Sequence, residues 1–114
     1  MSDERKLAVV WSSGDRMVAL SMVFMYTKNS MLKGWWDRVR LVVWGPSSKL
    51  LTEDEALQKE LKAMQEAGVE IQACRACADM HGVTDKLEAL GIEVIYMGKP
   101  LTDILQSDWT CMTF

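Results

Sequence analysis

The sequence predicts an α/β protein in which helices cover both faces of a mostly parallel five-stranded sheet. Short apolar runs alternate with longer helix-like segments along the whole chain, and the connections between them are short. Nearly continuous apolar runs are typical of strands buried on both faces of a parallel sheet. Strand–helix alternation favours parallel strands joined by crossover helices, and so predicts an α/β/α sandwich.

The first two strands and the helix between them have clear signals. The apolar run KLAVVW at 6–11 predicts a buried strand. SSGD follows it, and its hydroxyl, glycine and acidic residues are typical of a helix start. We expect this helix from Asp15 to Lys33. DRVRLVVW at 37–44 predicts the second strand, with GPSS at 45–48 as its exit loop.

The second half of the chain continues the alternation. Thr52 and Glu55 in TEDE match the reciprocal pair of a capping box, so a helix is expected from there to Ala67. Thr84 is a possible cap of a later helix, and Pro100 suits a first helical turn. The remaining elements are expected as strands at 69–74, 92–97 and 109–114, and as helices at 75–81, 84–90 and 100–106.

Length and composition limit the class of protein. With 114 residues and 49% apolar content, the chain predicts one domain over 1–114. Its net charge of −3 and dispersed basic residues argue against direct binding of nucleic acid. The charged start MSDERK is unlike a signal peptide, and the apolar stretch at 17–26 is too short to cross a membrane. We therefore expect a cytoplasmic protein with no membrane partner.

The first helix also bears on assembly. It is apolar almost all round from Met17 to Tyr26, whereas a helix covering one core shows a single apolar stripe. Five tryptophans and nine methionines add apolar surface to a small domain. We expect a homo-oligomer; the alternative is a helix buried deep in a single core.

Ligands of open α/β sheets bind outside the carboxyl ends of the strands. Cys74 ends the third predicted strand, and it is the strongest nucleophile at this rim. Cys74 and Cys77 lie at the predicted start of a helix, where backbone amides favour a thiolate. The positive charge of the adjacent Arg75 could favour it further. The candidate binding residues at the rim are Ser12, Ser13, Gly14, Gly45, Pro46, Arg75, Gly98 and Lys99.

The spacing Cys74-x-x-Cys77 has several readings. Zinc binding needs a second ligand pair, and His81 and Cys111 supply a poor one, so no metal is expected. A thioredoxin-like pair is disfavoured because the motif follows the third strand, although a dithiol couple stays chemically possible. Three cysteines in a reducing compartment argue against a disulfide framework. Burial as inert packing residues is the remaining alternative.

Other residues near the rim have structural explanations. Ser12, Ser13 and Asp15 suit helix capping. His81 suits a helix C-terminus, and Lys99 a solvated loop. Trp11 and Trp44 are expected either to wall the cleft or to fill the core. Cys111 is expected to pack in the last strand.

The segment ACRACADMHGVTD at 73–85 resembles the DsrE/DsrF-like family of small sulfur-relay proteins. VVWSSGD, VVWGPS and GIEVIYMGKPLTDIL extend this resemblance over the whole chain. It implies a three-layer α/β/α fold of the YchN type, and a trimer or hexamer. Cys74 falls on the sulfur-carrying cysteine of the family. Ala76, Cys77 and Ala78 fall on the small-residue run, and Gly82, Val83 and Thr84 on the turn that follows.

The resemblance implies a protein that handles sulfur without a cofactor. Cys74 is expected to accept and transfer sulfane sulfur as a persulfide, with Cys77 assisting or resolving, and with donor and acceptor proteins as partners. Two departures stand out. Cys77 stands where many relay subunits carry alanine or serine, and Met80 and His81 replace a more basic pair. The alternative is a ligand-binding or scaffold module of the same fold without thiol chemistry.

Overall fold

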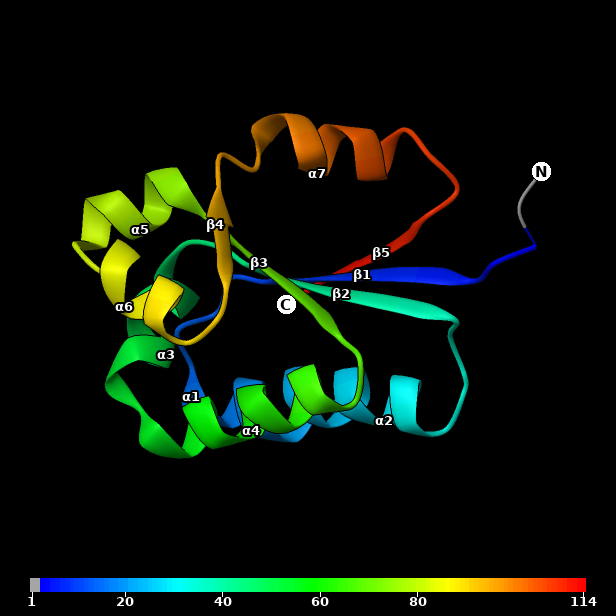
Figure 1. The fold of residues 1–114 in the computed structure, drawn as a ribbon, viewed down its shortest axis with the longest axis horizontal. Coiled ribbons are helices and arrows are strands. Elements are labelled where there is room, and N and C mark those ends of the chain that lie inside the picture. Colours follow the sequence, from blue (N-terminus) through cyan, green and yellow to red (C-terminus); the bar gives the residue numbers. More distant parts are fainter. Residues whose placement is uncertain (1–2) are drawn as a thin grey trace.

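The structure is a computed structural model that describes residues 3–114 (Figure 1). The first two residues of the charged MSDERK segment lie outside the described part. The described residues contain five strands, all parallel, in the order β4-β3-β2-β1-β5. Their bounds are β1 Lys6–Trp11, β2 Arg38–Val43, β3 Glu70–Cys74, β4 Glu93–Ile95 and β5 Thr110–Thr113.

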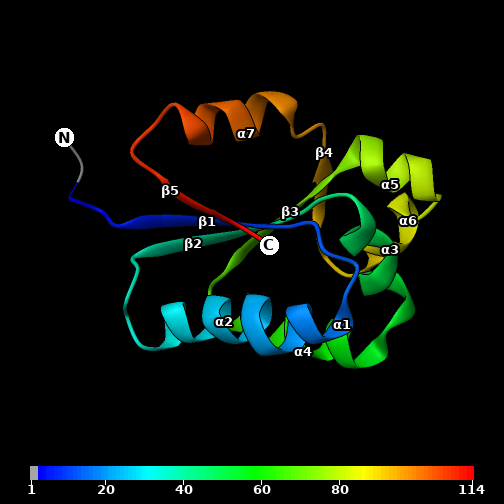
Figure 2. The ribbon, with the colours of Figure 1, turned by 180° about the vertical axis from the view of Figure 1, so that it is seen from behind.

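Helices form the two outer layers and one end of the molecule. Their bounds are α1 Arg16–Val18, the π-helical η1 Ala19–Phe24, α2 Met25–Leu32, α3 Pro46–Glu53, α4 Glu55–Glu66, α5 Arg75–His81, α6 Thr84–Ala89 and α7 Gly98–Leu105. The continuous α1–η1–α2 helix and α4 lie on one side of the sheet, and α7 lies on the other (Figures 1 and 2). The predicted three-layer α/β/α fold is confirmed.

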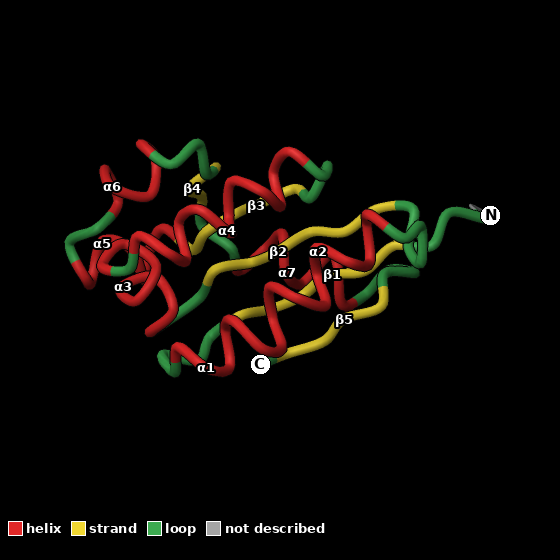
Figure 3. The backbone as a smooth tube through the Cα atoms, turned by 90° about the horizontal axis from the view of Figure 1, so that it is seen from below, coloured by secondary structure: helices red, strands yellow, loops and turns green. Residues whose placement is uncertain are grey.

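The face of the sheet under α1, η1, α2 and α4, here called the buried face, holds the main core. Seen from below in Figure 3, these helices run along the strands. Alternate residues of each strand point to this face. Leu7, Val9 and Trp11 of β1 are fully buried in this core, as are Leu41 and Val43 of β2. The Trp11 and Phe24 rings meet edge to face with centroids 4.9 Å apart.

The opposite face, here called the α7 face, has a smaller apolar cluster. Val10, Val42, Cys74 and Met97 form it, and Leu101 of α7 packs against it. It lies toward the carboxyl ends of the strands, where α3, α5 and α6 also gather (Figure 1). The cysteine predicted to be functional therefore belongs to the less covered face.

The segment after β2 differs from its prediction. GPSS is not an exit loop, because α3 begins at Pro46. Proline is favoured at the first helical position, where no N–H is needed. Thr52 lies inside α3 and donates to the Lys49 carbonyl. The capping box is therefore wrong: Asp54 caps α4 by accepting a 3.2 Å hydrogen bond from Leu57 N–H.

The other caps also differ in detail. Asp15, and not Ser12 or Ser13, caps the first helix by accepting from Met17 and Val18 N–H. Thr84 is the first residue of α6 rather than its cap, and its hydroxyl donates to Asp79. Among the described residues, no helix is long and apolar enough to span a membrane.

Candidate functional site

The loops after β1 and β2 are held together at the carboxyl ends of the strands. Trp44 N–H donates to the Trp11 carbonyl at 3.0 Å, and Ser47 N–H donates to the Ser12 carbonyl at 3.2 Å. A Cβ on Gly14 would lie 3.3 Å from Pro46 Cβ, so the two loops approach closely at this glycine. These contacts give the rim a fixed shape.

Two cysteine side chains meet beside these loops. Cys74 ends β3 and is 6% exposed, and Cys77 lies in the first turn of α5. The two thiol groups are close enough for the Cys74 sulfur to act on the pKa of the Cys77 thiol. Both side chains pack in the apolar cluster of the α7 face. The spacing of two intervening residues therefore brings two sulfurs together at a strand end.

The environment of Cys77 favours its protonated form. Burial is the largest cause that raises the pKa of this thiol, and the neighbouring Cys74 sulfur raises it further as hydrogen-bond acceptor and as a charge. Hydrogen bonds from the Gly45 backbone and the Trp44 side chain lower the pKa by smaller amounts. The thiolate that was expected at Cys74 or Cys77 is therefore disfavoured at Cys77.

Cys111 is the third thiol on the same face. It lies on β5, opposite Ala8 of β1, and packs against the same cluster as the cysteine pair. Burial raises the pKa of its thiol, and a hydrogen bond from Thr113 partly offsets this. The sequence predicted Cys111 as a packing residue and a poor zinc ligand, because the pairing of β5 with β1 has no local signal.

An apolar pocket adjoins the cysteine pair. Its volume is about 490 Å³, within the size range of small-molecule sites. Trp44 and Gly45, which both contact the Cys77 thiol, are part of its wall. The complete lining is Val10, Ser12, Trp44, Gly45, Leu101, Leu105, Cys111 and Thr113. The pocket therefore lies where α/β folds usually bind ligands, at the carboxyl ends of strands.

Gly45 and Trp44 line this pocket, whereas Trp11 lies in the main core. Gly45 has φ of +72°, a conformation that favours glycine, and it carries the chain from β2 into α3. Trp44 is 38% exposed and walls the pocket. Trp11 is fully buried in the main core.

Other predicted rim residues have different contacts. The Arg75 guanidinium lies 3.9 Å from Glu88 of α6. The Lys99 ammonium pairs with Asp103 at 2.6 Å, and Gly98 begins α7. Ser13 accepts a hydrogen bond from Asp15 N–H. Arg75 and Lys99 therefore both form ion pairs with neighbouring carboxylates.

Two further predicted residues are accounted for by local structure. Ser12 lines the pocket, and its hydroxyl donates to the Phe114 carbonyl at 2.8 Å. His81 is exposed at the end of α5. Within residues 3–114, no group of three or more His, Cys, Asp or Glu side chains is arranged to hold a metal ion.

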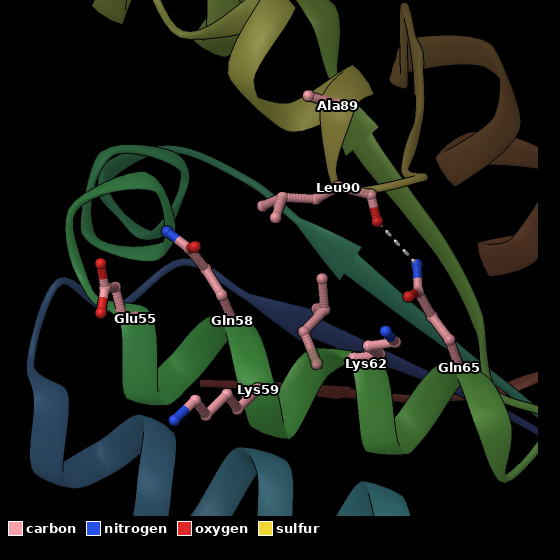
Figure 4. Close-up of a pocket in the computed structure, with 8 residues that line it drawn as sticks. Glu55, Gln58, Lys59, Lys62, Gln65, Ala89 and Leu90 are labelled. Carbon is pink, nitrogen blue, oxygen red and sulfur yellow. Dashed lines mark hydrogen bonds between the residues drawn. The ribbon is translucent and has the colours of Figure 1, made fainter.

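A second hollow lies between α4 and the end of α6 (Figure 4). Its volume is about 470 Å³, and Gln65 crosses its edge to donate to the Leu90 carbonyl at 3.2 Å. Its lining is Glu55, Gln58, Lys59, Leu61, Lys62, Gln65, Ala89 and Leu90. This lining holds no thiol, so the cysteine site and this hollow are separate.

The fold and the strand-end thiols together define an α/β/α protein with a paired-cysteine site. The family model for the DsrE/DsrF-like family matches residues 6–114. The chain belongs to the DsrE/DsrF-like family. This membership supports a role related to sulfur relay in general.

Solved structures have the same fold. BT1422 of Bacteroides thetaiotaomicron, a conserved protein of unknown function, is 35% identical, with 96% of this chain and 94% of that chain covered and a TM-score of 0.93. YchN of E. coli is 16% identical, with 96% and 99% covered and a TM-score of 0.71. MTH1491 of Methanobacterium thermoautotrophicum, also of unknown function, is 16% identical, with 98% and 100% covered and a TM-score of 0.77. No curated protein matches the chain.

Proposed function

We propose that the protein is a sulfur carrier in which Cys74 holds sulfane sulfur as a persulfide. The observation that carries the proposal is the contact between the Cys74 and Cys77 thiols beside a ligand-sized pocket at the strand ends. The raised pKa of Cys77 favours its protonated form, which supports Cys74 as the attacking group of the pair. Family membership supports the same general role.

The loading step needs no external electron acceptor. The Cys74 thiolate attacks the outer sulfur of a donor persulfide, so that a new S–S bond forms on Cys74. The S–S bond of the donor breaks, and the donor leaves as a thiolate. Attack by an acceptor thiolate on the outer sulfur reverses these bond changes and delivers the sulfur.

Cys77 offers a second outcome for the loaded protein. Its thiolate attacks Cys74 Sγ, the bond to the outer sulfur breaks, and hydrosulfide leaves. The outer sulfur is reduced to sulfide while the two cysteines are oxidised to a disulfide. A low-molecular-weight thiol then reduces this disulfide. Because the pKa of Cys77 is raised, this release becomes faster as the pH rises.

Intact mass measurement tests the proposal. The reduced protein is incubated with a persulfide donor, freed of the donor and weighed beside Cys74→Ser, Cys77→Ser and Cys111→Ser variants. We expect the wild-type and Cys111→Ser proteins to gain one sulfur that a reductant removes, and Cys74→Ser to gain none. Longer persistence of the adduct in Cys77→Ser identifies Cys77 as the resolving thiol. A sulfur gain in Cys74→Ser equal to that of the wild type contradicts the proposal.

One observation favours a second candidate function. Cys74 is 6% exposed and lies in an apolar cluster, as expected of an inert cysteine that lines a ligand-binding module. The two candidates differ in reactivity. A carrier is labelled at Cys74 by the donor, whereas a lining cysteine stays unlabelled under conditions that modify an ordinary reactive thiol.

The proposal includes a homo-oligomer, a trimer or hexamer, that exchanges sulfur with donor and acceptor proteins in the cytoplasm. Exposed apolar side chains on the first helix support the oligomer: Met17, Met22 and Met25 are all more than 45% exposed. Together with Trp35 they leave an apolar surface that a monomer exposes to water. Light scattering tests this, because Met22→Glu is expected to dissociate the oligomer and a monomeric wild type contradicts it.

A further inference from the structure

The pocket beside the cysteine pair has a chemical character of its own. Leu101 and Leu105 of α7 cover one side, and Trp44 forms an aromatic wall. None of the eight lining side chains carries a charge at neutral pH. Lys99 and Asp103, the charged residues within α7, pair with each other and are not part of the lining.

This lining discriminates between sulfur compounds. Burying an ion against uncharged, mostly apolar side chains costs several kcal/mol unless a partner is present. Anionic compounds such as thiosulfate therefore find no counter-charge here. A neutral compound with an apolar body gains free energy from contact with Leu101, Leu105 and Trp44.

The pocket also reaches the thiols. Leu101 and Cys111 pack against the same cluster as Cys74 and Cys77. Trp44 and Gly45 belong to the pocket wall and also interact with the Cys77 thiol, although Cys74 and Cys77 themselves are not part of the lining. The pocket and the cysteine pair therefore share Trp44, Gly45 and the apolar cluster as neighbours.

We propose that this pocket binds the apolar body of a neutral small organic disulfide or persulfide and presents its sulfur atoms to the Cys74–Cys77 pair. The inference rests on the proposed function and adds the substrate class: a small neutral compound with a carbon body. With a disulfide, the attacking thiolate forms a mixed disulfide on the protein, the S–S bond of the compound breaks, and the second half leaves as a thiolate. With a persulfide, the outer sulfur is transferred as described for loading.

Two disulfide reagents, one neutral and one anionic, test the proposal. Neutral dithiodipyridine and dianionic dithiobis-nitrobenzoate both release a coloured thiolate when a cysteine attacks. All proteins carry Cys111→Ser, because Cys111 also lines the pocket. Rates are divided by those of glutathione to remove the intrinsic reactivity of each reagent. We expect the normalised rate to favour the neutral reagent about tenfold or more and to saturate with its concentration.

A matched pair of variants separates the pocket from general charge effects. Leu105 lines the pocket and is 62% exposed, and Leu32 ends α2 on the other side of the sheet and is 63% exposed. Leu105→Asp and Leu32→Asp add the same charge at equally exposed sites. We expect Leu105→Asp to slow the neutral reagent about tenfold and Leu32→Asp to leave its rate unchanged.

Three results overturn the inference. They are an absence of selectivity for the neutral reagent, equal effects of the two aspartate variants, and a change of oligomeric state in Leu105→Asp alone. The last result, measured by light scattering, assigns the pocket to a contact between copies. Sulfur loading of Cys74 from an inorganic polysulfide is measured on the same samples. If loading persists while selectivity is absent, the substrate class is wrong and the carrier function stands; if loading is also absent, the function itself fails.

Discussion

The two faces of the sheet differ in how they are covered and in what they carry. The buried face has helices along its length, and residues such as Leu7, Val9 and Leu41 are fully buried there. The α7 face has one covering helix and a small apolar cluster at the carboxyl ends of the strands. Charged side chains lie toward the amino ends of β2 and β3 on this face.

The charged half of the α7 face is held by ion pairs and by one aromatic ring. Arg38 and Glu70 form two hydrogen bonds of 2.7 and 2.8 Å, and Arg40 joins the same carboxylate at 3.2 Å. The two guanidinium groups lie 5.0 and 4.7 Å from the centroid of the Trp109 ring. Such partly exposed contacts contribute little to stability compared with a dry core.

We infer from this difference that the buried face provides most of the stability and that the α7 face carries the chemistry. A thiol needs access to donors and acceptors, which four covering helical segments would block. The α7 face leaves a pocket at the strand ends, which is lined in part by Leu101 and Leu105 of α7. The buried face is therefore expected to tolerate substitution least, and the α7 face to tune reactivity.

Adjacent residues of β2 test this assignment with the largest expected effect. Leu41 points to the buried face, and Arg40 points to the α7 face. We expect Leu41→Ala to lower the free energy of unfolding by about 2–5 kcal/mol, because it leaves a cavity in the main core. Arg40→Ala is expected to cost about 1 kcal/mol, because Glu70 keeps its bonds to Arg38.

Chemical denaturation followed by fluorescence measures both variants. Equal losses of stability in Leu41→Ala and Arg40→Ala would show that the two faces contribute alike to the free energy of unfolding. Val10, which belongs to the small cluster of the α7 face, offers an intermediate position.

The cysteine pair allows a second, smaller test on the α7 face. The raised pKa of Cys77 predicts slow alkylation at neutral pH, with a pH–rate midpoint above the ordinary thiol value. Cys74→Ser removes the neighbouring sulfur, so the midpoint of Cys77 is expected to fall and its alkylation at neutral pH to become several-fold faster. The midpoint is expected to stay above the ordinary value because burial, the largest cause, remains.

Cys111 is the internal control for this measurement. Burial is the cause that raises the pKa of its thiol, and Cys74 is not among its causes. Its alkylation profile, read by peptide mapping in the same samples, is expected to be unchanged in Cys74→Ser. A midpoint of Cys77 that does not move in this variant would contradict the coupling of the two thiols.

The sequence predicted the fold and the cysteine pair because their signals are local. Apolar runs marked the strands, and their alternation with helix-like segments marked the order of the elements. The spacing of Cys74 and Cys77 after the third strand was enough to place them at one strand end. These features depend only on neighbours within a few residues, which a pattern records directly.

Features that depend on distant contacts were missed or wrong. The pair Gly45–Pro46 indicated a loop, although a proline also begins helices, and here it begins α3. Cys111 joined the cysteine cluster because β5 pairs with β1 at the edge of the sheet. No short pattern encodes that strand order. The raised pKa of Cys77 likewise depends on burial, which spacing does not report.

The smallest expected effect is a pH dependence of the free energy of unfolding, caused by Glu70 in the charged half of the α7 face. Hydrogen bonds from Arg38, the largest cause, lower the pKa of the Glu70 carboxyl below its ordinary value, and Arg40 adds to this. A carboxyl whose pKa is lower in the folded state stabilises the protein above its unfolded pKa, and this contribution is lost as the pH falls through the folded pKa. Because Glu70 is partly exposed, solvent screening limits the contribution to less than about 1 kcal/mol.

Glu70→Gln is therefore expected to be less stable than the wild type near neutral pH, and the difference is expected to shrink as the pH falls below the ordinary carboxyl pKa of about 4.3 and through the lowered folded pKa. Denaturant midpoints measured from pH 3 to pH 7 give this difference, with Glu66→Gln, at an exposed position ending α4, as the control. A stability difference that stays constant over this range would mean that Glu70 contributes through packing rather than charge. The charged half of the α7 face would then stabilise the fold in the same way as the buried face, and only the cysteine half would remain distinct.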